Sequence, residues 1–468
     1  MNSPSTRTVT DLASKIDTGM DALVQQLTEL IRHRSISADG NVSKVRETAQ
    51  HITALLADAG VEAELIDVGD DGRQHAPLVY ADHRCADAAP DTPTVLLYAH
   101  YDVHPADGWE EAFTPVVDTS SNRLYGRGAA DDKAGIVMHL GAIRAFDGTP
   151  PVHLKLAWEG EGEAGRGSLE ELVRERPDLF QADVVIVADS GNVRPGVPTL
   201  TTSLRGLATM DVTVRTLQRP VHSGTCGGPA PDAFTALVRM LATLHAPDGS
   251  IAPELLSRHE WQGAEVSEEQ FRDDAHILPD VQLTGAGSVA QRLYADPAIN
   301  VIGLDGIPPV DRARHSVCDR ATARLSIRLS PEMSSASETL GKLRQHLESV
   351  RPWNVETTIQ DRVVSAGYQA DVDKKTFQDA ESALLGAYSG MSEVAYTGRG
   401  GSLPLVAALQ EVNPGAVMLV WGCEEPLTDI HGDGENVALP ELRNMTLAEA
   451  TLFDSLRSEP GTGADRVA

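Results

Sequence analysis

The stretch PTVLLYAHYDV, residues 93–103, decides the fold class, because its long apolar run is typical of a strand buried on both faces. Two runs of the same kind follow, VHLKLAWEG at 152–160 and ADVVIVADS at 182–190. Between the first two lies AGIVMHLGAIRAF, residues 134–146, whose pattern indicates a helix. This alternation predicts an α/β domain with a mostly parallel central sheet and helices on both sides.

The hydrophobic pattern changes after the motif SLRG at 203–206. The string TARLSIRLS at 322–330 alternates strictly between apolar and polar residues, which is typical of a sheet with one face in solvent or against helices. Helical runs lie between such strands, so we predict an inserted α+β domain. The predicted division gives 205–368 to the inserted domain, and 1–204 and 369–468 to the two parts of the α/β domain.

Length and composition set limits on the class of protein. The chain has 468 residues, too many for one hydrophobic core. Its formal net charge of -29 argues against nucleic acid and membrane partners, because such a surface repels phosphate backbones and anionic lipids. The sequence starts without an apolar leader and has no run long enough to cross a bilayer, so we expect a cytoplasmic protein. Its four cysteines are far apart, as expected for reduced thiols.

A histidine and an aspartate mark the end of the first buried strand. His100 and Asp102 stand two residues apart, so alternation places their side chains on the same side of the chain. Ligands gather at the carboxyl ends of strands in α/β sheets, and a metal-binding histidine commonly donates its second N–H to a carboxylate. Taken alone, H-x-D is a weak signal, because surface pairs of this kind are common.

Further carboxylates and a second histidine follow strand ends or turns. They are Asp131 and Asp132 in LYGRGAADDKAG, Glu159, Glu161 and Glu163 in WEGEGEAG, Asp189 in VADSGN and His431 in DIHGDGEN. Helix capping and a solvated acidic loop are the alternatives for the acidic residues. So many carboxylates near one another would repel strongly without cations. Imidazole and carboxylate suit zinc, which activates water, whereas a Ser-His-Asp hydrolase is disfavoured because G-x-S-x-G is missing.

The order of these motifs resembles that of the M20 family of metallopeptidases. HYDVHP, GRGAADDKAG, the acidic strand end, SLRG, VHSGTCGG and RGGSLP follow one another as in that family. The resemblance is closest to its dipeptidase branch, the carnosinase-like and cytosolic non-specific dipeptidase-like enzymes. It extends from the first helix to beyond His431, and an ordered set of this length is very specific.

The resemblance implies two zinc ions per chain, with manganese or cobalt as alternatives. Asp131 would bridge the ions, and its bond to Asp132 would be a cis peptide. One ion would be completed by His100 and Asp189. The other would be completed by Glu163 and His431, and Asp102 would orient His100.

The resemblance also implies where a substrate would bind. The inserted domain would be a lid through which two copies form a homodimer. His222 of VHSGTCGG would reach a partner's active site and stabilise the oxyanion. Arg328 and the loop with Gly400, Gly401 and Ser402 would hold the terminal carboxylate of a small peptide. The implied activity is hydrolysis of dipeptides or short peptides with a free C-terminal carboxylate.

The sequence departs from the family pattern at one catalytic position. The family has two consecutive glutamates, a general base and then a metal ligand, which fall on Gly162 and Glu163 here. Glycine cannot accept a proton, so Glu161 is the alternative base, in a turn that flanking glycines make flexible. We expect a glutamate at 162 to be tolerated, with its side chain in solvent. The other functions considered are an N-acyl amino acid deacylase or desuccinylase on the same scaffold, and a catalytically impaired peptide- or metal-binding homologue.

Overall fold

The computed structural model describes residues 8–38, 40, 42–69, 74–165, 167–252, 259–331, 336–401 and 403–457. The chain forms two compact units. Unit 1 comprises Met1–Thr202, Ala370–Tyr396 and Ala408–Ala468, and unit 2 comprises Ser203–Gln369 and Thr397–Ala407. No helix within the described ranges is long and apolar enough to cross a membrane.

Unit 1 is built on a mixed sheet, which confirms the predicted α/β class. The strands of this sheet that lie wholly or mainly in unit 1 are, in spatial order, β1 (Glu64–Ile66), β2 (Leu78–His83), β6 (His153–Glu159), β3 (Thr94–His100), β7 (Val184–Val187), β17 (Val417–Val420) and β8 (Thr199–Leu204). The central strand β3 pairs in parallel with β6 and β7, and β17 is parallel to β7. The flanking pairs are antiparallel. The parallel strands therefore bring their carboxyl ends to one edge of the sheet.

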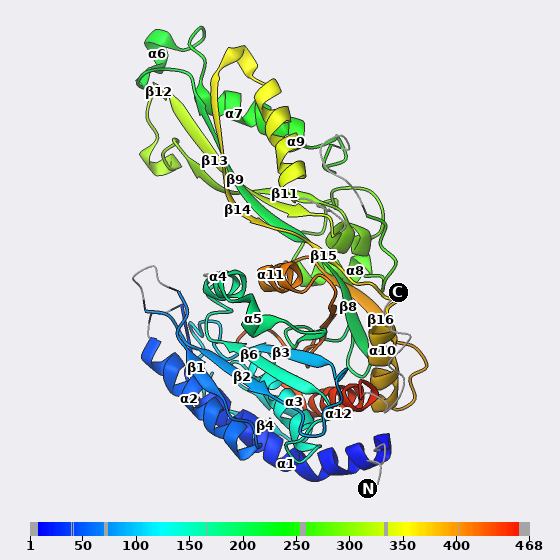
Figure 1. Ribbon diagram of the computed structural model, residues 1–468. Coiled ribbons are helices and arrows are strands. Elements are labelled where there is room, and N and C mark those ends of the chain that lie inside the picture. Colours follow the sequence, from blue (N-terminus) through cyan, green and yellow to red (C-terminus); the bar gives the residue numbers. More distant parts are fainter. Residues whose placement is uncertain are drawn as a thin grey trace. The chain divides into compact units, whose positions relative to one another are not determined.

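Helices cover both faces of this sheet, as Figure 1 shows. On one side lie α1 (Val9–Arg32), α2 (Val42–Asp58), α3 (Lys133–Arg144) and α12 (Leu439–Ser455), and on the other lie α4 (Ser168–Glu175) and α5 (Pro177–Phe180). The predicted helix at 134–146 is α3, which is apolar nearly all round because it is buried between β3, α1 and α12.

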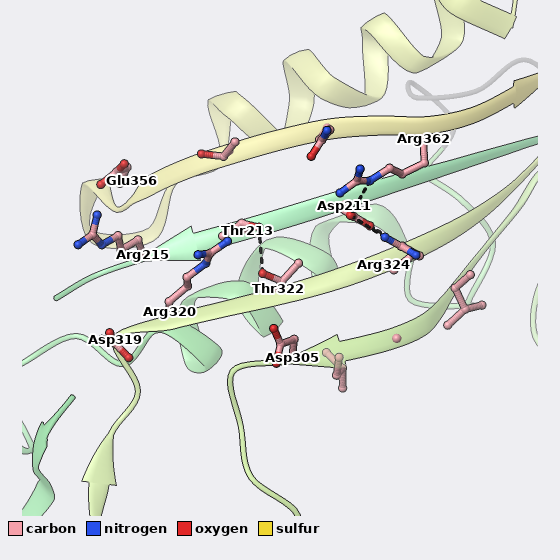
Figure 2. Close-up of a pocket in the computed structure, with 15 residues that line it drawn as sticks. Asp211, Thr213, Arg215, Asp305, Asp319, Arg320, Thr322, Arg324, Glu356 and Arg362 are labelled. Atoms are coloured by element: carbon pink, nitrogen blue, oxygen red, sulfur yellow. Dashed lines mark hydrogen bonds and ion pairs between the residues drawn. The ribbon is translucent and has the colours of Figure 1, made fainter. Parts of the chain in front are cut away.

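Unit 2 contains the alternating strand that the sequence predicts. Its four-stranded antiparallel sheet has the order β11 (Ala298–Asp305), β13 (Arg320–Leu329), β9 (Gly206–Arg215) and β14 (Glu356–Ser365). Helices α7 (Ala233–Leu241) and α9 (Ala336–Ser349) pack on one face, α7 over β13 and β9, and α9 over β9 and β14. The opposite face is polar and open (Figure 2). There Asp211 accepts hydrogen bonds from Arg324 and Arg362.

A small sheet in unit 1 connects two segments that are distant in sequence. Strand β5 (Arg123–Tyr125) pairs with both β4 (Val116–Asp118) and β18 (Asn436–Ala438). The turn after β5 leads to Asp131, and the loop before β18 contains His431. This pairing therefore holds together two segments that the sequence analysis assigned to one site.

Candidate metal centre and active site

The predicted ligands form two groups that share one aspartate. Ligand atoms of His100, Asp131 and Asp189 lie within 4.8 Å of one another, and so do those of Asp131, Glu163 and His431. His100 ends β3 and Asp189 follows the adjacent parallel strand β7, so the sheet edge brings them together. The structure thus gathers all five predicted ligands within unit 1.

Asp131 lies between the two histidines. Its Oδ1 is 2.9 Å from Nε2 of His100, and its Oδ2 is 3.1 Å from Nε2 of His431. Nε2 of His431 also lies 3.2 Å from Oε1 of Glu163. Each oxygen of one carboxylate therefore faces a different histidine, which is the arrangement that a bridging ligand between two metal ions requires.

The electrostatics of the site favour cations. Burial raises the pKa of Asp131, but the His100 and His431 imidazoles outweigh that effect and hold it below its usual range. Conversely, Asp131 and Glu163 raise the pKa of His431 to about 10. The donor set of imidazole nitrogens and carboxylate oxygens fits divalent zinc, and also manganese or cobalt.

Asp132 holds the backbone of the predicted metal ligand His100. Its Oδ2 accepts a hydrogen bond of 3.0 Å from the backbone N–H of His100. It stands at the start of α3, yet its side chain makes no capping hydrogen bond there, so the capping alternative does not explain it. The Asp131–Asp132 peptide bond is cis, as the family resemblance implied.

Asp102 contacts both halves of the site and is fully buried. Its Oδ1 lies 3.4 Å from Nδ1 of His100, as expected for a carboxylate that orients this ring. The same carboxylate accepts hydrogen bonds from the N–H groups of Gly162, at 3.0 Å, and Glu163, at 3.1 Å. Asp102 therefore also fixes the turn that presents Glu163, a role that the sequence did not indicate.

Glu161 is directed into a separate buried network. Its carboxylate accepts hydrogen bonds from the N–H of Ala76, at 3.1 Å, and the hydroxyl of Ser168, at 2.9 Å. Nδ1 of His75 lies 2.9 Å from the same carboxylate. The side chain is only 4% exposed. Of the three glutamates in WEGEGEAG, only Glu163 belongs to a ligand group among the described residues. The carboxylate of Glu159 instead accepts a hydrogen bond from the hydroxyl of Tyr98.

Gly162 packs directly against a predicted metal ligand. A Cβ atom at this position would lie 2.9 Å from Cγ and 3.0 Å from Cβ of His100. The expectation that the fold tolerates a side chain at 162 is therefore wrong in this respect: His100 or the turn would have to shift to admit its Cβ atom. His100 is held by Asp102, Asp131 and Asp132, so its ring has little freedom to move away.

Two supporting residues, Arg127 and Glu435, were not predicted from the sequence, although they lie in the motifs LYGRGAADDKAG and DIHGDGEN. Glu435 is fully buried and accepts hydrogen bonds from the N–H groups of Gly128, Ala130 and Asp131. Its other oxygen lies 2.6 Å from Nη1 of Arg127. Nη2 of Arg127 in turn donates to the carbonyl of His431 at 3.0 Å. The Arg127–Glu435 pair therefore holds the backbone of both Asp131 and His431.

The remaining predicted site residues belong to unit 2. His222 ends β10 (Val221–His222) and is exposed, and its Nδ1 accepts a hydrogen bond of 3.1 Å from the N–H of Gly224. Arg328 is half-buried on β13, and burial lowers its pKa. Gly401 is exposed, and Ser402 lies outside the described residues.

Comparison with known proteins identifies the family. Residues 96–454 match the model of peptidase family M20/M25/M40, so the chain belongs to this family. Peptidases of this family use divalent metal ions, and the two groups that share Asp131 are the candidate metal-binding residues.

Several relatives carry names that refer to dipeptides. A cysteinylglycine-S-conjugate dipeptidase of Corynebacterium striatum is 35% identical, over 92% of this chain and 94% of its own. A Cys-Gly metallodipeptidase of Schizosaccharomyces pombe is 30% identical, over 72% of this chain and 74% of its own. Human carnosine dipeptidase 1 has a similar fold, with a TM-score of 0.74 and 23% identity over 97% of this chain and all of its own.

Proposed function

We propose that this protein hydrolyses dipeptides with a free C-terminal carboxylate and holds two divalent ions, zinc being the best fit. The observation that carries this proposal is the position of Asp131, whose two oxygens face His100 and His431. The names of the dipeptidase relatives support the substrate class. A bound pair of ions polarises a scissile carbonyl and lowers the pKa of water.

The chain's own residues have distinct roles in this proposal. His100 and Asp189 would hold one ion, Glu163 and His431 would hold the other, and Asp131, which belongs to both groups, would serve the two ions. Asp102 orients His100 and keeps the Glu163 turn in place. His100 and Asp131 are buried, and Asp131 contacts both histidines, so these ligands are preorganised and need little reorganisation when a ligand binds.

Unit 2 supplies the groups for substrate recognition in this proposal. Arg328 and the loop with Gly401 and Ser402 bind the terminal carboxylate, because guanidinium and backbone N–H groups suit this anion. His222 stabilises the oxyanion in the active site of a second copy. Its Nδ1 is already bonded to Gly224, which leaves Nε2 for a ligand.

A homodimer through unit 2 is supported by an exposed apolar strand. Strand β11 lies at the edge of its sheet, and Val301, Ile302 and Leu304 on it are 48%, 58% and 60% exposed. The next loop adds Val310, at 94%. An unpaired edge strand with apolar side chains is suited to pairing with another chain.

All four cysteines are free thiols, which supports a reducing, cytoplasmic environment.

A catalytically impaired homologue is the second candidate function. Gly162 has no side chain to accept a proton, and the Glu161 carboxylate is occupied by His75, Ala76 and Ser168. Loss of a general base costs about 10²–10⁴ in rate, whereas ions alone still activate water. We therefore expect slow hydrolysis together with intact binding of metal and peptide.

The test is a substrate panel on the metal-loaded protein. It contains Cys-Gly, β-Ala-His, other dipeptides, their C-terminal amides and N-succinyl and N-acetyl amino acids, with metal content measured in parallel. Release of amino acids from dipeptides, with the amides resistant, would support the proposed function. Cleavage of acylated amino acids alone would favour the deacylase, and dipeptide binding without turnover would favour the impaired homologue.

A further inference from the structure

Arg205 is a buried arginine at the junction of three segments of unit 2. It follows β8 in the SLRG motif and is 8% exposed. Its Nε donates to the carbonyl of Gly400 at 3.2 Å, and its backbone N–H donates to the carbonyl of Arg399. Its Nη1 donates to the carbonyls of Arg292, at 3.2 Å, and Asp296, at 3.1 Å. The side chain therefore ties the glycine turn at 400 to a second segment of unit 2.

That second segment is unusual in its own right. Residues Gln291–Ala295 form a π-helix, labelled η2. This conformation is rare in proteins, and where it occurs it often lies at a functional site. The Arg205 guanidinium binds its carbonyl at Arg292 and that of the residue after its end, Asp296. Carbonyl groups that a helix end would otherwise leave unsatisfied are thus paired by Arg205.

The charge of Arg205 is not matched by an ion pair within the described residues. Its bonded acceptors are all backbone carbonyls. The Asp296 carboxylate attracts this charge, but no ion pair between the two is found in the described part of the chain, so a bound anion would stabilise the buried guanidinium further. Burial, and then the nearby Arg328 charge, lower the pKa of Arg205 to about 10, and the Asp296 carboxylate opposes them less strongly. The like charges of Arg205 and Arg328 therefore favour an anion near them.

One nitrogen of Arg205 is available at the glycine turn. Among the described residues none accepts a hydrogen bond from Nη2. A Cβ atom on Gly400 would lie 3.0 Å from Nη2, so glycine there lets the turn approach the guanidinium closely. Arg328 on β13 pairs with Leu207 on β9, and Leu207 follows Arg205 by two residues.

We propose that Arg205 is a positioning residue for the substrate carboxylate. It locks the Gly400 turn against the π-helix and adds a second positive charge beside Arg328. This inference rests on the proposed function, because it concerns the same carboxylate. It assigns to Arg205 an effect on ligands that carry a free C-terminal carboxylate, and none on ligands in which that group is an amide.

The test compares a dipeptide with its C-terminal amide on the metal-loaded protein. Binding is measured by calorimetry, so that the readout does not depend on turnover, and KM and kcat are measured where hydrolysis is detectable. Arg205→Lys keeps the charge but cannot reach all the carbonyls. We expect it to weaken dipeptide binding about 10–100-fold, the equivalent of one charge-assisted hydrogen bond, and to leave binding of the amide unchanged.

Arg344→Lys is the matched control, because Arg344 also bonds to a backbone carbonyl of unit 2, that of Ile359. It should change neither ligand. If Arg205→Lys fails to fold, Gly400→Ala gives a second measurement, since its Cβ would press on Nη2 and should weaken the dipeptide selectively. Equal loss for both ligands, or no loss, would overturn the positioning role. Wild-type protein that binds amide and dipeptide equally would contradict the proposed function itself, and this is seen before any variant is made.

Discussion

The backbone of Gly162 lies so close to His100 that a side chain at 162 would begin 2.9 Å from Cγ of the imidazole. The general-base position and a metal ligand are therefore sterically coupled in this chain. A glutamate placed there would add a carboxylate but also push on a ring that is fixed by Asp102 and Asp131. A glutamate at 162 would therefore speed proton transfer but displace His100 from the position in which it can bind a metal ion.

Two variants of equal size separate these effects. Gly162→Glu and Gly162→Gln displace His100 equally, but only the glutamate can accept a proton. We predict that kcat for a dipeptide is about 10²–10⁴ higher in Gly162→Glu than in Gly162→Gln, the usual contribution of a general base. Both should hold metal less tightly than the wild type, as should Gly162→Ala. Equal kcat values in the two variants would mean that the base position lies elsewhere.

Glu161→Gln tests whether the neighbouring glutamate is the base. Because its carboxylate is bonded to Ala76, Ser168 and His75, we predict a structural effect. The free energy of unfolding should fall by about 1–3 kcal/mol, with kcat at saturating metal changed little. Glu171→Gln on the exposed side of α4 is the control. Abolished turnover with full metal content would instead identify Glu161 as the base.

Removing the support beneath the ligands should weaken metal binding. Glu435→Gln keeps the size of the side chain but removes its negative charge. That charge pairs with Arg127, and the carboxylate accepts a hydrogen bond from the N–H of Asp131. We predict a loss of about 10–100-fold in metal affinity, the usual effect of a residue that orients ligands. Competition with a chromogenic chelator measures it. Unchanged affinity would show that the Arg127–Glu435 pair serves folding only.

The oligomeric state depends on the exposed edge of unit 2. Leu304→Asp, on the edge strand, should shift the protein from dimer to monomer in analytical ultracentrifugation, because a charge there opposes apolar contact. Leu278→Asp, which alters another exposed leucine of unit 2, is the control. The monomer should lose turnover while it keeps its metal, if His222 acts in a second copy. A fully active monomer would exclude that role.

The sequence predicted those parts of the site that follow from local pattern. The apolar strand before His100 and the alternation to Asp102 place both residues at a sheet edge, and the structure confirms that position. The antiparallel flank of the sheet was not predicted, since the short strand β2 at Leu78–His83 shows no strong pattern. Only the family resemblance distinguished Glu163 from its two neighbouring glutamates, because no pattern in the residues themselves does so.

Other features depend on contacts between distant segments, and local pattern carries no information about them. Glu161 meets His75, 86 residues away, and Arg127 meets Glu435, 308 residues away. A charged residue that will be buried and paired looks the same in sequence as one in solvent. The close approach of Gly162 to His100 likewise depends on a turn that Asp102 pulls toward the strand end.

Metal content, measured by mass spectrometry after dialysis, tests the central claim most directly. If two ions share Asp131, wild-type protein should retain about two divalent ions per chain, and His431→Ala about one. Asp131→Asn should lose most of both, because it weakens a ligand common to the two groups. Asp433→Asn, an exposed change two residues from His431, should retain the wild-type content. Wild-type content in both His431→Ala and Asp131→Asn would contradict the account.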